Sequence, residues 1–307
     1  MKTRLTSAEV AAPVRRRSRP EFAQLAIAVI LIALTLCTLL PLLHIVAVSL
    51  SDKSAVAAGK VFLLPVEFST AAYDAVTGDK DFYRAFLVSV ERVVLGVTIS
   101  LALTIMAAFA LSRRPEKFRA RTYYVWVLVF SMMFSGGMIP WYLTIRDLHL
   151  IDTIWALVLP SAVQIFNIII LMNFFRNLPR EMDEAAEVDG AGPWSTMTLV
   201  YLPMSLPSIA TVALFGIVFH WNSFFDGLIL MNSQEKYPLQ TYLNQIVVQM
   251  GMLDPNMTKE DIEQLAKLSD KTVSSAKILV SMLPILIIYP LLQKYFVTGL
   301  TLGSVKE

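Results

Sequence analysis

Six long apolar runs, separated by short polar segments, constrain this chain more than any other feature. The hydrocarbon core of a bilayer, about 30 Å thick, is crossed by about 20 apolar residues in an α-helix. Because 56% of the residues are hydrophobic and only 16% are charged, little sequence remains for a separate soluble domain. We therefore predict an all-α integral membrane protein with six transmembrane helices, at residues 22–50, 85–111, 123–142, 154–175, 204–231 and 278–296.

Basic residues gather in two of the polar segments and orient the chain. One group precedes the first run, and the other is packed into residues 113–121, after the second run. Lys and Arg near span ends favour the cytoplasmic side. With six crossings, both groups lie on the same side as the 176–203 loop, so we expect both termini in the cytoplasm. Residues 1–21 are then a basic cytoplasmic tail, and residues 22–307 form the transmembrane domain. The net charge of +2 reflects this orientation and not nucleic-acid binding.

The sequence lacks motifs for catalysis or metal binding. Its only cysteine is Cys37, and its three histidines, His44, His149 and His220, lack metal-ligand spacing. A histidine within a span is more often a hydrogen-bonded packing residue. No phosphate-binding loop of the Gly-x-x-x-x-Gly-Lys-Ser/Thr type is present. We therefore predict no catalytic residue, no metal, and no nucleotide or other cofactor bound by this chain.

The polar segment between the fourth and fifth runs predicts two short helices. Pro179 ends the preceding run, because the residue before a proline avoids helical geometry, and residues 180–189 are rich in helix formers. Gly190 can take the left-handed conformation that closes a helix. Pro193 suits the first turn of a second helix that extends to Tyr201.

The first of these helices carries an apolar surface. It consists of Met182, Ala185, Ala186 and Val188, with small alanines that permit close approach. Glu184 and Glu187 are placed to pair with Lys or Arg of a partner. The helical pattern alone favours an ordinary amphipathic helix at the membrane interface.

The spacing of residues in this segment resembles a known signature. The pattern is similar to the coupling-helix motif of permease subunits in binding-protein-dependent ABC importers. The residues that match it are Glu184, Ala185, Ala186, Gly190, Val200, Leu202 and Pro203. The flanks 136–140, 152–156, 174–179, 189–191, 220–222 and 299–306 resemble carbohydrate-uptake permeases. The likeness covers about residues 20–307 and is nearest to the second permease subunit of systems for maltose-like and complex oligosaccharides.

This resemblance implies a function and a set of partners. The chain would be a non-enzymatic, multi-pass permease of a bacterial inner membrane, surrounded by lipid, that imports oligosaccharides from an extracytoplasmic solute-binding protein. It would pair with a second permease and with two ATP-binding cassette subunits, which hold ATP and Mg. The implied coupling residues are Glu184, Ala185, Ala186, Asp189, Gly190, Leu202 and Pro203. The alternative is a secondary transporter or channel subunit driven by an ion gradient, which needs ionisable residues in mid-span.

Polar and aromatic residues inside the apolar runs are candidates for the substrate path. Asn222 and Asp226 are four residues apart, so on a continuous helix they share a face. Together with neighbouring aromatic rings, such residues suit sugar hydroxyls and ring faces. The other interpretation is hydrogen bonding between helices, and Arg92 is likewise expected to pair with another helix or to snorkel. The candidate path residues are Gln164, Asn167, Trp221, Asn222, Phe225 and Asp226.

The external segment from residue 232 to 275 is the longest polar stretch between two runs. Residues 237–252 and 259–268 predict helices, and Thr258 with Asp261 resembles a capping pair. A structured external loop fits contact with the solute-binding protein or a lid that packs on its own chain.

Overall fold

A computed structural model describes residues 21–251 and 270–304. Within these ranges the chain is helical and has no β-strand, apart from one isolated bridge between Ser51 and Phe68. The all-α fold class is confirmed. In chain order the elements are α1 (Glu21–Ser49), α2 (Lys53–Ala57), α3 (Ala71–Gly78), α4 (Lys80–Ser112), α5 (Arg121–Met133), α6 (Met138–Asp147), α7 (Ile154–Val158), η1 (Leu159–Ser161), α8 (Ile165–Arg176), α9 (Arg180–Val188), α10 (Pro193–Ser195), η2 (Thr196–Tyr201), α11 (Leu202–Met204), α12 (Leu206–Asn222), α13 (Phe225–Leu230), η3 (Gln234–Lys236), α14 (Leu239–Gly251) and α16 (Lys271–Ser304).

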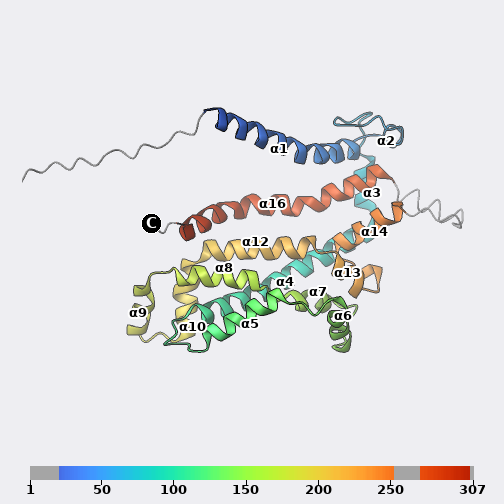
Figure 1. The fold of residues 1–307 in the computed structure, drawn as a ribbon. Helices are drawn as coiled ribbons and strands as arrows, with labels where there is room; N and C mark the ends of the chain where they lie inside the picture. Colours follow the sequence, from blue (N-terminus) through green and yellow to red (C-terminus); the bar gives the residue numbers. More distant parts are fainter. Residues whose placement is uncertain (1–20, 252–269, 305–307) are drawn as a thin grey trace, which may run out of the picture.

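The long helices lie side by side, and α9 projects at one end of the bundle (Figure 1). α4 is central, because α8 and α12 both pack along it. Its start is fixed by Asp79, whose carboxylate accepts the N–H groups of Asp81 and Phe82 at 3.0 Å. The same carboxylate contacts Lys277 Nζ at 2.6 Å and accepts the Tyr242 hydroxyl at 2.9 Å. One end of the bundle is thereby held by α4, α14 and α16 together.

Three helical segments are long and apolar enough to cross a membrane alone: Gln24–Ser49, Lys80–Ser112 and Lys271–Leu291. Three further segments are long and apolar enough to cross a membrane only if two helices joined by a bend are counted as one span. The bends are 111° between α5 and α6, 46° before α8, and 85° before α12. Within the described residues, six crossings therefore remain a prediction, in which three spans are unbroken and three are bent.

The third apolar run, predicted as one span at residues 123–142, consists of two helices, α5 and α6. α5 has 13 residues and is about 20 Å long, which is shorter than the hydrocarbon core of about 30 Å. The chain turns at Gly137, whose φ of 86° carries no steric cost in a residue without a side chain. A crossing at this place therefore needs the residues of the bend in addition to α5.

The fifth run is also divided, and this corrects a prediction. α12 ends at Asn222, Ser223 is extended with φ −71° and ψ 125°, and α13 begins at Phe225. The four-residue spacing of Asn222 and Asp226 would give a shared face only on a continuous helix. The expectation that these two side chains share a helix face is therefore wrong.

Other expectations concern the two ends of the chain and the external segment. α14 coincides closely with the helix predicted at 237–252. The helix predicted at 259–268, its capping pair Thr258 and Asp261, and the basic tail before residue 21 lie outside the described residues.

Candidate functional site

α9 forms where the sequence predicted the first short helix, and its end is closed by a glycine. Gly190 has φ 72°, so the left-handed corner is confirmed. The N–H of Gly190 donates to the Glu187 carbonyl at 3.0 Å, and the N–H of Ala191 donates to the Ala186 carbonyl at 2.8 Å. These bonds satisfy carbonyls that a helix end otherwise leaves open.

The second short helix begins at Pro193, as predicted, but it is not a regular α-helix. After α10 the chain adopts π-helical winding in η2, and α11 with Leu202 and Pro203 follows. π-helical turns are rare and occur often at functional sites. The last residue of η2, Tyr201, is buried and packs edge-on against Phe109 of α4 and Phe175 of α8. The second helix is therefore attached to the two central helices.

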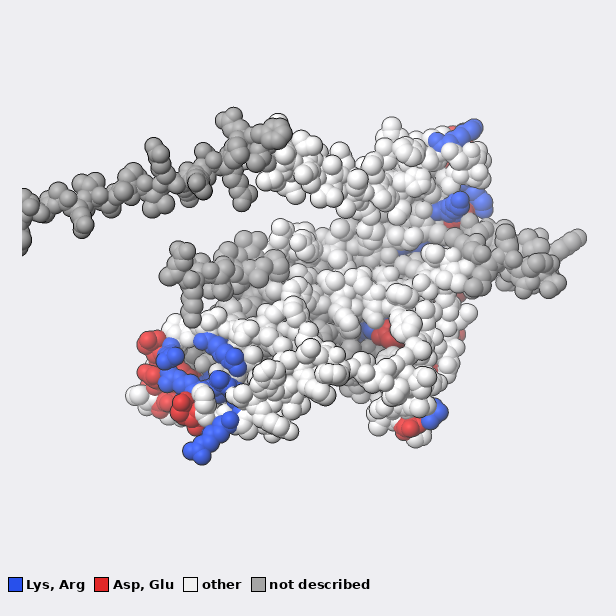
Figure 2. All heavy atoms as spheres, viewed as in Figure 1, with Lys and Arg blue, Asp and Glu red and all other residues white. Residues whose placement is uncertain are grey.

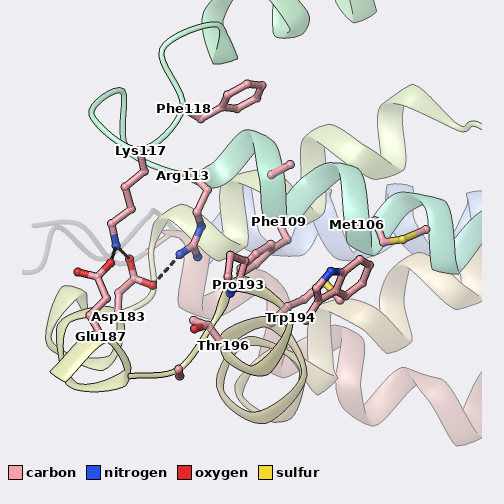
Figure 3. A pocket seen from close by; sticks show the side chains of 13 residues that line it. Met106, Phe109, Arg113, Lys117, Phe118, Asp183, Glu187, Pro193, Trp194 and Thr196 are labelled. Atoms are coloured by element: carbon pink, nitrogen blue, oxygen red, sulfur yellow. Dashed lines mark hydrogen bonds and ion pairs between the residues drawn. The ribbon is translucent and has the colours of Figure 1, made fainter. Parts of the chain in front are cut away.

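Ion pairs bind α9 to the basic segment that follows α4. Arg113 donates to Asp183 at 2.6 Å, and Lys117 donates to Asp183 at 2.9 Å and also to Glu187. Figure 3 shows Lys117 reaching both carboxylates from above α9. We call Arg113, Lys117, Asp183 and Glu187 the α9 clamp. Asp183 was not among the residues predicted from the sequence, although an acidic and a basic loop that flank the same apolar runs are a signal for such pairing.

The clamp is reinforced by aromatic rings. The Arg113 guanidinium lies 4.1 Å from the Phe109 ring centre and 4.3 Å from that of Tyr201. A cation over an aromatic face is stabilised by about 0.5–2 kcal/mol, depending on how far it is removed from water. The Arg113 side chain is 13% exposed and that of Asp183 is 11% exposed, so this pair is largely shielded. The inner face of α9 is consequently rigidly attached to α4.

The outer face of α9 is exposed and partly apolar. Met182 and Val188 are exposed, as are Trp194 and Leu199 on the following turns. Ala185 shares this side, whereas Ala186 is buried against the chain itself, so the outward apolar surface lacks that one predicted member. Glu184 also faces outward and contacts Arg114 at 3.1 Å, with the Glu184 side chain 61% exposed. Exposed apolar patches rimmed by charge mark interaction surfaces.

A groove of about 560 Å³ lies between the end of α4 and the two short helices. Trp194, Pro193, Phe109 and Met106 form its apolar side, and the α9 clamp closes the other end (Figure 3). The groove lies between α10 and the end of α4. The two short helices are therefore joined to α4 mainly through the α9 clamp and the contacts of Tyr201.

Replacing Asp183 with Asn is expected to loosen α9 by about 1–3 kcal/mol, because two cations lose a shielded charged acceptor. Burial disfavours the charged form of Asp183, but hydrogen bonds from Lys117 and Arg113 outweigh it and hold the pKa below 3.8. A group with a lowered pKa stabilises the fold above its unfolded pKa, and this contribution is lost as the pH falls through the folded pKa. Burial lowers the pKa of Lys117, yet its bonds to Glu187 and Asp183 raise it above 10.5. Its contribution is lost only at higher pH, so we expect a constant clamp between about pH 5 and pH 9.

The measurement is the rate of tryptic cleavage within residues 113–121 of the folded protein. Asp183→Asn should be cut faster than the wild type at pH 7, and the ratio of the two rates should approach one in acid, where both proteins are compared with a protease active at low pH. Glu181→Gln is the matched control, because Glu181 lies on α9, is exposed, and has no ion pair among the described residues. Equal cleavage of both variants would contradict a role for the clamp.

Asp226, a predicted path residue, is bound within the chain. Its carboxylate forms a two-pronged ion pair with Arg92 of α4, with Nη1 to Oδ1 at 3.1 Å. It also accepts the Ser223 hydroxyl at 3.0 Å, while Arg92 donates to the Ser223 carbonyl at 3.2 Å. Arg92 is fully buried, so the expectation that it pairs with another helix is confirmed. This cluster fastens the break between α12 and α13 to α4.

The remaining path candidates lie in separate places. Trp221 is buried and donates to the Ser281 carbonyl of α16 at 3.1 Å, and Asn167 donates to Gln164 at 2.5 Å. Asn222 is exposed and lines a hollow of about 330 Å³ between α12, α14 and α16. Phe225 is exposed. Of the six candidates, Asn222 and Phe225 present their side chains on the surface of this chain, and the others serve internal contacts to a large extent.

His220 is a packing residue. It is 1% exposed and lies so close to Gly96 of α4 that a Cβ there would be 2.5 Å from the imidazole ring. Within the described residues neither ring nitrogen of His220 has a hydrogen-bond partner, so His220 packs as expected but is not hydrogen-bonded, whereas Nδ1 of His44 in the first predicted span lies 2.6 Å from the Phe62 carbonyl oxygen. Only a glycine at position 96 allows the two helices to approach this closely.

Comparison with known proteins agrees with this architecture. Residues 100–302 match the family described as binding-protein-dependent transport system inner membrane component. The polygalacturonan/rhamnogalacturonan transport system permease protein YtcP of Bacillus subtilis (strain 168) is 37% identical, over 90% of this chain and 95% of that protein. Protein LplC of the same organism is 40% identical, over 88% and 90%. A crystal structure of a bacterial ABC transporter involved in the import of the acidic polysaccharide alginate aligns with a TM-score of 0.81 and 36% identity, over 93% of this chain and all of that one. The chain therefore belongs to the family of binding-protein-dependent transport system inner membrane components, the membrane-spanning permeases of ABC transporters.

Proposed function

We propose that this chain is one permease subunit of an ATP-driven ABC importer, which takes up oligosaccharides delivered by an extracytoplasmic solute-binding protein. The observation that carries the proposal is α9, a short helix that is fixed to α4 on its inner face and exposes Glu184 and apolar side chains on its outer face. Such a helix suits docking into a cytoplasmic ATPase subunit. Family membership favours this function over the alternative of an ion-gradient-driven transporter or channel.

The complex would contain a second permease and two ATP-binding cassette subunits, which bind ATP and Mg. α1 supports a membrane partner, because its apolar side chains are exposed along nearly the whole helix and need lipid or another apolar helix around them. Both termini and α9 would face the cytoplasm of a bacterial cell, and α14 would lie on the outer side.

Movement of α9 would reach the membrane helices by two routes. The first is the α9 clamp, which joins Asp183 to Arg113 at the end of α4. The second is Tyr201, which contacts α4 and α8 and is followed by the 85° bend into α12. Closure of the ATP-bound subunits would thus displace α4, α8 and α12 together. The proposed coupling residues all lie within or between these two routes. They are Glu184, Ala185, Ala186, Asp189, Gly190, Leu202 and Pro203.

The substrate would be an oligosaccharide that carries carboxylates. This rests on the names of similar proteins, because YtcP is named for polygalacturonan and rhamnogalacturonan, and the aligned crystal structure is named for the acidic polysaccharide alginate. Asn222 and Phe225, the two exposed path candidates, would supply hydrogen bonds and a ring face, and the partner permease would supply further contacts.

The test is reconstitution of this chain in lipid vesicles with candidate permease, ATPase and solute-binding protein partners from the same organism. We expect the tagged chain to co-purify with the second permease and with the ATPase subunits. Oligogalacturonate with the binding protein should stimulate ATP hydrolysis and accumulate in the vesicles, whereas a neutral maltooligosaccharide of equal length should do neither.

Two results would contradict the proposal in different ways. Stimulation by the neutral sugar alone would overturn the carboxylate substrate but not the importer. Failure to bind any ATPase subunit, or labelling of a cysteine at position 187 from outside intact cells in a Cys37→Ala background, would overturn the importer itself.

A further inference from the structure

A second hollow, of about 260 Å³, lies beside the α9 clamp and is rich in arginine. It is formed where the end of α4, the start of α5, the end of α8 and the start of α9 meet. Figure 2 shows charged side chains gathered at this end of the molecule and others at the opposite end, while the surface between the two ends is nearly free of charge. Its only acidic lining residue is Asp183, and its basic lining residues are Arg113, Arg114, Arg121, Arg176 and Arg180.

Three of these arginines have no carboxylate partner. Arg113 and Arg114 are paired with Asp183 and Glu184. Within residues 21–251 and 270–304, Arg121, Arg176 and Arg180 form no ion pair. The hollow therefore has a local excess of positive charge that the described part of the chain does not neutralise.

The positions of these groups are fixed by the fold. Arg121 donates to the Arg113 carbonyl at 2.6 Å, and Arg176 donates to the Leu111 carbonyl at 3.1 Å, so both guanidinium groups are held at the end of α4. Each retains further N–H groups. Free N–H groups of Arg121 and Arg176 are thus gathered at the hollow before any ligand arrives.

Capping of α4 explains only part of this arrangement. The C-terminal end of a helix attracts a cation by about 0.3–1 kcal/mol, which accounts for Arg121 and Arg176. It does not account for Arg180, which lies on a different helix and bonds to no described carbonyl. Like charges that lie close together repel one another, so an anion between these arginines would stabilise the site.

We propose that this hollow binds a phosphate group, supplied by an anionic phospholipid headgroup or by a soluble phosphate. Guanidinium groups bind phosphate oxygens through paired, charge-assisted hydrogen bonds. The hollow lies at the ends of α5 and α8, where the apolar runs meet the polar loops, which is the depth of lipid headgroups. Basic pockets between transmembrane helices bind such headgroups in other membrane proteins. The inference is independent of transport and of the partners proposed above.

The test uses the purified full chain in lipid nanodiscs and needs no other subunit. Nanodiscs of phosphatidylcholine with and without phosphatidylglycerol form one arm, and titration of inorganic phosphate into phosphatidylcholine nanodiscs forms the other. Arg180→Gln is the main variant, because Arg180 is exposed and makes no bond that folding needs. Arg119→Gln is the matched control, since Arg119 is exposed in the same basic segment, does not line the hollow, and has no ion pair among the described residues.

We expect phosphatidylglycerol or phosphate to raise the melting temperature of the wild type. Arg180→Gln should weaken the apparent affinity for the phosphate ligand about fivefold. The affinity should fall about 100-fold in the triple variant that combines Arg121→Gln, Arg176→Gln and Arg180→Gln. Arg119→Gln should change it less than about twofold.

The two arms distinguish the sources of the phosphate. A response to phosphatidylglycerol alone identifies a lipid site, and a response to millimolar inorganic phosphate identifies a soluble ligand. Equal losses in Arg119→Gln and Arg180→Gln would show diffuse surface attraction and overturn the site. No response to either ligand in the wild type would also overturn it, and neither result would affect the proposed importer.

Discussion

A complex that carries Gly190→Pro is expected to assemble and yet to lose at least about tenfold of its substrate-stimulated ATP hydrolysis, which corresponds to about 1.4 kcal/mol. Gly190 has φ 72°, whereas proline fixes φ near about −65°. Proline would also remove the N–H that donates to the Glu187 carbonyl. The corner between α9 and α10 then cannot form as it stands, and motion of α9 would not reach Tyr201 and α12.

Gly190→Asn is the matched variant, because asparagine tolerates the left-handed region better than other residues with side chains. A Cβ at position 190 meets no atom within 4 Å, so steric exclusion does not complicate the comparison. We expect this variant to keep most of its activity. ATPase and uptake rates in Gly190→Pro that equal those of the wild type would remove α9 from the proposed coupling route.

A second large effect is expected at the buried ion pair of Arg92 and Asp226. Arg92→Leu should cost about 3–5 kcal/mol, because it leaves a largely buried carboxylate without its partner. The Arg92 side chain is 0% exposed and that of Asp226 is 17% exposed. The double variant Arg92→Leu with Asp226→Leu should recover much of this loss, since apolar pairs often replace buried ion pairs at little cost. The melting temperature and yield of the purified chain compare Arg92→Leu, Asp226→Leu and the double variant with the wild type.

Asn222→Ala provides the contrast. Asn222 is exposed beside the break, so its loss should leave yield and melting temperature unchanged and should alter uptake only if the adjoining hollow carries substrate. If Arg92→Leu and Asp226→Leu each cost less than about 1 kcal/mol and their effects simply add, the pair does not fasten the break.

Features set by local sequence were predictable. The apolar runs placed most of the long helices, and the Pro179, Gly190 and Pro193 pattern gave the position of α9, its left-handed corner and the start of the next helix. Each of these depends on the conformational limits of single residues or on burial along one helix, and both can be derived from neighbouring positions.

Features set by distant partners were not predictable. The break at Ser223 depends on Arg92, which is 131 residues away in sequence and bonds to the Ser223 carbonyl. Polar residues at 220–223 interrupt the apolar run, but nothing local shows that they break the helix, so residues 204–231 were predicted as one span and Asn222 with Asp226 as one face. Asp183 likewise has no distinguishing local pattern, and its role follows from Lys117 and Arg113, which the fold brings beside it.

In the π-helical winding of η2, hydrogen bonds join residues five positions apart instead of the four of an α-helix. A turn in this stretch therefore holds about one residue more than an α-helical turn. Deleting a single residue between 196 and 201 would therefore let the segment rewind as an ordinary α-helix without breaking the chain. Because the wider turn takes up the extra residue, its removal and rewinding would leave the side chains on its N-terminal side, including Trp194, near their present angle around the helix axis. Adding or removing a residue in a neighbouring α-helical turn has no such compensation and would rotate the docking face by about 100°. The π-helical stretch is thus a place where one residue can be lost with little change in the direction of the transmitted motion.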